Sequence, residues 1–203
     1  MRATGTGLAR AAPAVLAGAV LLIAALLITG CGTEQRAPEH GRQSELQAPL
    51  SAVADSPAAP QTLTVQGVSA PTRAVQTDAA GALLPPQDVA EVGWWVDSAL
   101  PGSGRGTIVI TGHIDEAEQG DGFAKRFTVL QTGDTVQLTT ADGRRLDYRI
   151  IRRQQADKES GFPADELNRL DGPERLALVT CGGAFVGPPL GYRDNIIAWA
   201  EPA

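Results

Sequence analysis

Residues 106 to 112 read Gly106-Thr107-Ile108-Val109-Ile110-Thr111-Gly112, a run of β-branched side chains bounded by a glycine at each end. The run is too short for an amphipathic helix, and it lacks the polar-apolar alternation of a strand with one solvated face. Such a run is typical of a fully buried β-strand.

Six further short runs are also rich in apolar residues, and Gly, Pro or Asp residues separate them. They span residues 62–66, 93–96, 135–139, 146–152, 175–180 and 195–200. Asp142-Gly143 lies between two of these runs and predicts an antiparallel hairpin. Only residues 123–130 and 163–170 could hold short helices. We therefore expect an all-β domain, and a closed or nearly closed barrel in preference to an open sheet, because many short strands must protect their edges.

The composition excludes several classes of protein. The chain has 203 residues, with 17 Lys and Arg against 23 Asp and Glu and a formal charge of -6. This surplus of carboxylates argues against a nucleic-acid binder, which needs a basic face. Two widely separated cysteines build neither a disulfide framework nor a Cys-rich zinc site. Hydrophobic residues make up 43% of the chain, enough for one core of ordinary size.

The N-terminus predicts export. Arg2 and Arg10 are the only charges before Glu34, and residues 11–28 are almost entirely apolar, which is typical of a signal peptide or a membrane anchor. The run ends in Leu27-Ile28-Thr29-Gly30-Cys31, which resembles the lipobox of bacterial lipoproteins and implies a diacylglyceryl group on Cys31. The alternative is an uncleaved helix of about 20 residues, long enough to span a bilayer of ~30 Å. Both place the rest of the chain on the extracellular face of the cell membrane.

The rest of the chain divides into a linker and a domain. Residues 32–61 are rich in Ala, Pro, Gln, Glu and Ser, and their few large apolar side chains line no face. Such a segment cannot offset the entropy of its own ordering, so we expect a disordered spacer in which His40 is inert. The folded domain is expected over residues 62–203, after a signal or anchor at residues 1–31.

Within this domain the reactive side chains are few. Cys181 is its only cysteine and His113 its only histidine, and each stands at the end of an apolar run beside a glycine. A free thiol has a pKa of about 8.5, and a neighbouring imidazolium or guanidinium favours the thiolate that attacks carbonyl carbon. Strand ends 68 residues apart can meet on one rim of a barrel. Gly182 and Gly183 remove bulk beside the thiol, so that backbone N–H groups or a substrate can approach.

Other interpretations of these residues remain open. A single Cys in a β-protein is often a small buried hydrophobe. An exported protein, however, exposes an unpaired thiol to oxidation, which a structural role hardly requires. A zinc site made of Cys181, His113, Asp115 and Asp194 is disfavoured, because no two of these ligands show a chelating spacing. We expect neither a metal nor another cofactor.

Several blocks of the sequence resemble the sortases, class F in particular. Thr180-Cys181-Gly182-Gly183, followed by Gly191-Tyr192-Arg193-Asp194-Asn195-Ile196-Ile197, is similar to the signature of that family. Thr111-Gly112-His113-Ile114-Asp115 is similar to its histidine motif. Further blocks that match in order and spacing are residues 67–71, 88–95 and 101–104. The resemblance covers about residues 63–203 and implies an eight-stranded sortase barrel that is mostly antiparallel and carries short helices.

The resemblance also implies a reaction. Cys181 would be the nucleophile, His113 the general acid and base, and Arg193 the third catalytic residue, holding the substrate carbonyl and the developing oxyanion through its guanidinium. The substrate would be a secreted protein with an LPXTG-like sorting signal, cleaved between Thr and Gly. The thioacyl enzyme would then pass the protein to an amine acceptor, such as a cell-wall precursor peptide or a pilin lysine.

Substrate contacts are expected from Thr180, Phe162, Gly182 and Gly183. Thr180 could assist the oxyanion, or be an ordinary strand residue. Phe162 lies in the segment 156–171, which occupies the position of the loop that lines the sorting-signal groove in sortases, although it could simply close over the core. Asp115 could orient His113 or cap a turn.

Two other functions compete with transpeptidation. One is a catalytically silent lipoprotein domain that binds peptides and uses Cys181 structurally. The other is a hydrolase in which water replaces the amine acceptor. No calcium site is expected, because Glu116, Glu118 and Asp121 are typical of a solvated turn.

Overall fold

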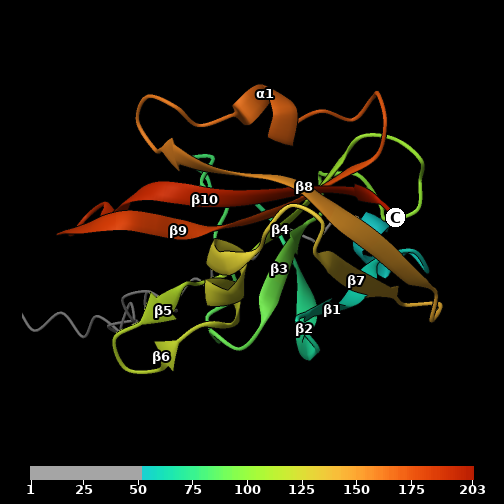
Figure 1. Ribbon diagram of the computed structural model, residues 1–203, viewed down its shortest axis with the longest axis horizontal. Coiled ribbons are helices and arrows are strands. Elements are labelled where there is room, and N and C mark those ends of the chain that lie inside the picture. The colour runs from blue at the N-terminus through green and yellow to red at the C-terminus, as the bar shows by residue number, and fades with distance from the viewer. Residues whose placement is uncertain (1–51) are drawn as a thin grey trace, which may run out of the picture. The chain divides into compact units, whose positions relative to one another are not determined.

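The computed structural model describes residues 52–203, which contain a closed eight-stranded barrel (Figure 1). Its strands are β1 (Pro60–Val65), β2 (Val68–Val75), β3 (Val92–Trp95), β4 (Thr107–Thr111), β7 (Thr135–Thr140), β8 (Arg145–Asp157), β9 (Arg175–Gly187) and β10 (Gly191–Pro202). Around the barrel they follow the order β1-β2-β3-β4-β9-β10-β8-β7. A separate two-stranded hairpin consists of β5 (Asp115–Glu116) and β6 (Gly120–Asp121). The predicted all-β closed barrel is confirmed.

The strand β4 lies between β3 and β9 in the barrel. It pairs antiparallel with β3 and parallel with β9, in a register that sets Thr111 beside Val179. All five residues of β4 are buried, as its continuous apolar sequence predicts. Because paired parallel strands run in the same direction, the residues after Thr111 and those after Val179 lie at the same end of the barrel. This pairing brings two distant parts of the chain together.

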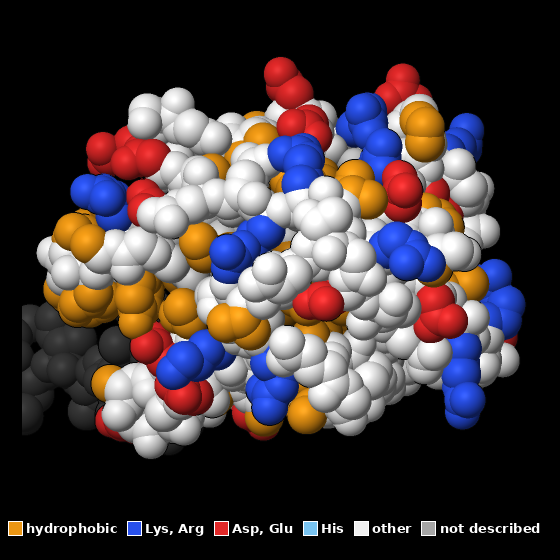
Figure 2. Space-filling model, viewed as in Figure 1, with side chains coloured by type: hydrophobic (Ala, Val, Ile, Leu, Met, Phe, Trp, Pro, Cys, Tyr) orange, Lys and Arg blue, Asp and Glu red, His pale blue; other side chains and the backbone are white. Residues whose placement is uncertain are grey.

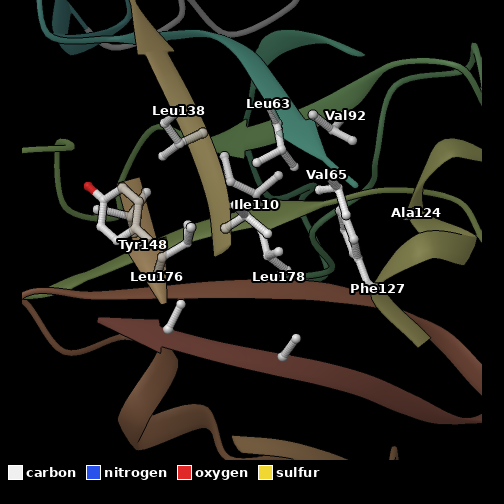
Figure 3. Packing of buried hydrophobic residues seen from close by; sticks show 14 of the residues in the cluster. Leu63, Val65, Val92, Ile110, Ala124, Phe127, Leu138, Tyr148, Leu176 and Leu178 are labelled. Carbon is white, nitrogen blue, oxygen red and sulfur yellow. The ribbon is translucent and has the colours of Figure 1, made fainter. Parts of the chain in front are cut away.

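The barrel is filled by aliphatic side chains from most of its strands. Leu63, Ile110, Leu138, Leu176 and Leu178 are completely buried. Figure 3 shows them meeting in one cluster between the strands. Fully burying such a side chain contributes about 1.5–3 kcal/mol. The interior is therefore a packed core rather than a channel.

A second apolar cluster covers the other face of β4 and β9. Its buried members are Val109, Ala156, Leu167, Ala177, Val179, Ile197 and Trp199. Leu167 comes from the helix α1 (Ala164–Leu167), which lies above β8, β9 and β10 in Figure 1. Because both faces of β4 are covered, its sequence needs no polar alternation.

The two predicted short helices are present. The segment 123–130 contains the 3₁₀ helix η2 (Phe123–Val129), and the segment 163–170 contains α1. Phe123, Ala124 and Phe127 of η2 are buried against the barrel. Gly112 makes this contact possible, because a Cβ atom at that position would lie 2.7 Å from the Cβ of Ala124. The hairpin predicted at Asp142-Gly143 joins β7 to β8.

Order begins earlier than the sequence predicts. The segment 52–61 belongs to the expected spacer, yet it holds the 3₁₀ helix η1 (Ala52–Asp55) and the first two residues of β1. Val53 packs against the core cluster and Ala59 is buried, so apolar burial stabilises this end of the predicted linker. Residues 1–51, with the predicted signal or anchor, Cys31 and His40, lie outside the described residues. Within residues 52–203 no helix combines the length and hydrophobicity that a bilayer crossing requires.

Candidate active site

A cavity of about 940 Å³ lies at the end of the barrel to which β4 and β9 both lead. Cys181 and His113 line it together. Its apolar wall comes from the segment 81–85, which precedes β3, and from side chains that include Phe162 and Leu167. The volume and the apolar lining are typical of a site for a small ligand or a short peptide segment. The two reactive residues predicted from the sequence thus share one cavity.

The strand β9 places Cys181 on the cavity wall. Cys181 is paired with Asn195 of β10 and is partly exposed. The preceding residue, Thr180, is almost completely buried and also lines the cavity. Its hydroxyl donates a 2.8 Å hydrogen bond to the carbonyl of Gly112, the residue before His113. A thiol that is held on a rigid strand and open to a cavity is suited to nucleophilic attack.

His113 lies two residues after the end of β4, and its half-buried position there lowers the pKa of its imidazole. Burial lowers the pKa of His113 below its ordinary value of 6.5, and the neighbouring charge of Glu116, a hydrogen bond to the Pro86 backbone and the charge of Asp115 oppose this shift only in part. The imidazole is therefore mainly neutral at neutral pH. A neutral imidazole can accept a proton from a thiol or from an amine.

Asp115 makes its hydrogen bond away from His113. The Tyr192 hydroxyl donates to Asp115 Oδ2 at 2.5 Å, a contact that joins β5 to β10. This hydrogen bond is the main cause of a raised pKa for Tyr192. The ring of Phe185 packs edge-on against Tyr192, with 5.3 Å between ring centroids. The carboxylate thus connects the loop after His113 to the β9–β10 hairpin.

The two glycines after Cys181 do not line the cavity. A Cβ atom at Gly182 would lie 2.5 Å from Ile196 Cγ1, and one at Gly183 would lie 2.1 Å from Asp194 Oδ2. Gly183 also has a φ of +75°, which side chains disfavour. In this structure the glycines make room for the protein's own side chains, and the structure does not bring them to the predicted substrate position.

Arg193 lies close to the cavity but outside its lining. Its side chain is 55% exposed, and Nε lies 3.4 Å from Oδ1 of the buried Asp194. The charge of Arg193 also helps to lower the pKa of Asp157 on the neighbouring strand β8, after hydrogen bonds from Ser160 and from the backbone. The structure therefore brings Cys181 and His113 together and leaves the guanidinium of Arg193 beside two carboxylates.

A family comparison connects this geometry to known proteins. The family model for the sortase domain matches residues 63–203. The chain belongs to the sortase family. No curated protein matches the chain.

Solved sortase structures share the fold of this sortase at low sequence identity. Sortase C-1 from Actinomyces oris is 21% identical, with a TM-score of 0.53 and coverage of 70% of each chain. Sortase A from Corynebacterium diphtheriae, a lid mutant, is 20% identical, with a TM-score of 0.52 over 70% of this chain and 68% of the other. A pilus-related sortase C of Group B Streptococcus is 15% identical, with a TM-score of 0.53 over 71% and 66%. These similarities establish the fold.

The sortase site contains one cation that the sequence did not indicate. Lys158 follows β8, and its Nζ lies 3.7 Å from Cys181 Sγ and 3.2 Å from the carbonyl oxygen of Leu190. Its backbone N–H donates to the carbonyl of Arg193 at 3.2 Å. No local motif marks this lysine, because the contact with Cys181 depends on how β8, β10 and β9 align.

The apolar wall of the cavity includes a segment that sequence reasoning also missed. Leu83 and Leu84 precede β3 and line the cavity, as does the predicted Phe162. Leu84 and Phe162 are exposed, so a bound molecule could cover them. The two prolines of the segment 81–86 were the available signal, since they favour an extended backbone beside the site.

The β9–β10 hairpin extends the apolar surface beyond the cavity. Phe185 and Val186 are exposed near its tip, while Pro189 and Leu190 line the cavity. Figure 2 shows hydrophobic side chains gathered at the left end, where Figure 1 places the far ends of β9 and β10. Charges of both signs are interspersed over much of this face.

Among residues 52–203, no group of three or more His, Cys, Asp or Glu side chains is placed to hold a metal ion.

Proposed function

We propose that this sortase is an extracellular cysteine transpeptidase of the class F type, which cleaves an LPXTG-like sorting signal between Thr and Gly and transfers the protein to an amine of the cell envelope. One observation carries the proposal: Cys181 and His113, from segments far apart in the sequence, line the same cavity of a sortase domain. The class F assignment rests on the signature around Cys181 and Arg193.

The first half of the reaction forms a thioester. His113, mainly neutral, accepts the proton of the Cys181 thiol, and the sulfur attacks the carbonyl carbon of the Thr residue. A C–S bond forms and the Thr–Gly C–N bond breaks. The proton on His113 then passes to the departing amine. The thioacyl enzyme and a free peptide with an N-terminal Gly remain.

In the second half of the reaction, His113 accepts a proton from the incoming amine instead of donating one to a departing amine. An amine of the acceptor attacks the thioester carbonyl, and His113 accepts the proton that the amine loses. A new amide bond forms and the C–S bond breaks, so that the sulfur regains its proton from His113. The lowered pKa of His113 supports this role, because the imidazole must be unprotonated when the amine arrives.

The cavity wall favours an extended, partly apolar peptide. We assign Phe162 and the segment 81–85 to binding of the apolar residues that precede the cleaved bond, because these groups form the apolar wall beside Cys181. Thr180 acts as a positioning residue, since its hydroxyl is already bonded to Gly112. Gly182 and Gly183 leave room for Ile196 and Asp194 beside the proposed nucleophile.

Arg193 is assigned to the oxyanion. Its guanidinium is half-exposed and its contact with Asp194, at 3.4 Å, is long, so a rotation of the side chain costs little. A guanidinium can hold two oxygens at once, as a carbonyl and an oxyanion require. The proposed extracellular location and membrane tether rest on the apolar N-terminal segment that ends at Cys31.

The test uses the full chain in detergent with a peptide that contains Leu-Pro-Glu-Thr-Gly. The peptide is incubated with and without triglycine, and products are identified by mass. A product in which triglycine replaces the C-terminal fragment supports transpeptidation. Cleavage to the free acid alone makes the protein a hydrolase, and binding without cleavage makes it a silent peptide binder. Cys181→Ala is the control and should form neither product nor thioacyl enzyme.

A further inference from the structure

The thiol of Cys181 has a cation beside it that the sortase motifs do not contain. Lys158 Nζ lies 3.7 Å from Sγ, within hydrogen-bond distance for a sulfur acceptor. The same ammonium donates to the carbonyl of Leu190 at 3.2 Å. Both Lys158 and Leu190 line the cavity, so the charge faces the space where substrate would bind.

The backbone fixes the side from which this cation arrives. Lys158 directly follows β8, and its N–H donates to the Arg193 carbonyl of β10. Cys181 lies on β9, the next strand along the sheet, where it pairs with Asn195. The lysine therefore reaches across β10 from a position that pairing of β8 with β10 defines.

The other cationic groups of the site are poorly placed to stabilise a thiolate. Arg193 directs Nε to Asp194 and lies outside the cavity lining. His113 is mainly neutral at neutral pH, because burial lowers its pKa. Lysine side chains ordinarily carry a full positive charge at this pH. Of these three groups, it is Lys158 whose charged atom lies within hydrogen-bond distance of the sulfur.

We propose that Lys158 is a further catalytic residue of this sortase, whose ammonium stabilises the thiolate of Cys181 during attack on the sorting signal. The inference rests on the proposed function only for the identity of the reaction. An opposite charge within about 4–6 Å of an acid favours its ionised form by 1–3 pH units. Lys158 thus supplies the charge while His113 carries the proton.

Other titratable groups around the thiol must be considered in any pH experiment. His113 faces it from the end of β4. From β10 come Tyr192, whose pKa is raised chiefly by its hydrogen bond to Asp115, and the Arg193–Asp194 pair. Asp157 of β8 lies next to Lys158 in the sequence and its pKa is lowered chiefly by a hydrogen bond from Ser160. All of these side chains are kept when residue 158 is changed, so variants at residue 158 differ only in the side chain at that position.

The experiment measures alkylation of Cys181 by iodoacetamide from pH 5 to 10 in the full chain in detergent. The modified peptide is quantified by mass, which separates Cys181 from Cys31, and Cys181→Ala confirms the assignment. The chain offers a matched control, because Lys125, its only other lysine, is exposed and pairs with Asp121. The variants are Lys158→Gln, Lys158→Arg and Lys125→Gln, with thermal unfolding recorded for each.

In Lys158→Gln we expect the rate profile to move to higher pH and alkylation at pH 7 to slow by roughly tenfold, because the thiolate loses the neighbouring positive charge. Lys158→Arg should retain most of the wild-type rate, and Lys125→Gln should match wild type. A neutral variant with an unchanged profile overturns the inference, even if it unfolds at a lower temperature, since that result assigns Lys158 only to holding Leu190. Should Lys158→Gln fail to fold, Lys158→Met provides the second neutral side chain.

Alkylation and transpeptidation can fail independently. If the profile shifts as expected but no peptide is transferred or cleaved, the thiolate role of Lys158 stands and the proposed function fails. If triglycine is joined to the peptide and Lys158→Gln keeps the wild-type profile, the proposed function stands and Lys158 is not catalytic.

Discussion

The hydroxyl of Thr180 donates a 2.8 Å hydrogen bond to the carbonyl of Gly112, and these are the residues that precede Cys181 and His113. The bond continues the parallel pairing of β4 with β9 beyond Thr111 and Val179, alongside a backbone bond from Gly112 N–H to the Val179 carbonyl at 3.2 Å. It therefore ties the segment that carries the proposed nucleophile to the segment that carries the proposed base, and it explains a threonine at a buried position.

Thr180→Val tests this connection, because it keeps the branched shape and removes the donor. We expect a loss of about 1–3 kcal/mol in the free energy of unfolding, since the Gly112 carbonyl loses a buried partner. Single-turnover acylation should slow further than a change in folded fraction explains. Thr180→Ser, which retains the hydroxyl, should recover both. If the valine variant acylates at the wild-type rate, the hydrogen bond is not needed to position Cys181 and His113.

Burial of His113 predicts a pH dependence of stability. Its folded pKa lies below the ordinary value of 6.5, so between these two values the unfolded chain binds a proton that the folded chain does not. Stability is therefore lost as the pH falls below about 6.5, and this contribution is constant above it. Denaturant unfolding at pH 8 and pH 5 should show a larger loss for wild type than for His113→Gln. Equal losses in the two proteins would contradict the assigned burial effect.

A buried carboxylate outside the cavity lining predicts a purely structural effect. Glu174 is 5% exposed and accepts hydrogen bonds from the Tyr148 hydroxyl at 2.7 Å, from Gly102 N–H at 3.1 Å and from Gly104 N–H at 2.6 Å. Figure 3 shows the Tyr148 ring within the core cluster. Burial, together with the Glu174 hydrogen bond, raises the pKa of Tyr148 well above its ordinary value.

Glu174→Gln should destabilise the fold by about 1.5–3 kcal/mol, because one amide group that donates replaces an oxygen that accepts. Urea unfolding measures this loss. Activity per folded molecule should stay at the wild-type level, since Glu174 does not line the cavity. A specific loss of activity in fully folded Glu174→Gln would require a link between the loop 101–106 and the site.

The sequence predicts those strands whose residues are buried on both faces. The run 106–112 predicts β4 correctly, because both of its faces are covered. The strand β2 was missed because Val68–Val75 includes a proline and alternates only weakly between buried and exposed residues. The strand β9 continues past Thr180 to Gly187, where glycines interrupt the apolar pattern but the pairing with β10 persists.

The sequence does not predict features of the site that depend on the direction of side chains. The resemblance predicts Cys181 and His113 together, and the register of β4 with β9 shows why they meet. Lys158 reaches the thiol only through the alignment of three strands, which no spacing in the sequence reveals. Gly183 was assigned to substrate access, whereas its missing side chain makes room for Asp194.

Cys31→Ser tests the proposed anchor. If Cys31 is lipidated, the change should leave an uncleaved precursor without the acyl mass at a new N-terminus, because the thioether to the diacylglyceryl group cannot form. A helix that spans the bilayer by hydrophobicity should be indifferent to this substitution. Intact mass of the membrane-bound protein distinguishes the two. An unmodified, full-length wild-type chain in membranes would favour the spanning helix.

Arg193→Lys tests whether the proposed mechanism needs the guanidinium group of Arg193 or only its positive charge. If the residue supplied only positive charge, lysine would retain much of the activity, and Lys158 would already provide such a charge beside the sulfur. If the guanidinium must hold a carbonyl and an oxyanion together, lysine should fail nearly as badly as alanine. We expect the second result, with a loss of about 2.7–4 kcal/mol of transition-state stabilisation in both variants.

Single-turnover acylation measures this loss, and thermal unfolding controls for the fold. Removing the guanidinium also breaks the 3.4 Å contact with the buried Asp194, which keeps its hydrogen bond from the Gln155 amide, so thermal unfolding measures what this contact contributes to stability. The alkylation profile of Cys181 provides a second control: it should stay close to wild type in Arg193→Lys, because the proposed mechanism assigns Arg193 to the substrate oxygen and Lys158 to the sulfur. An Arg193→Lys variant that acylates within a few-fold of wild type would remove Arg193 from the oxyanion site and leave Lys158 as the cation that matters for the chemistry.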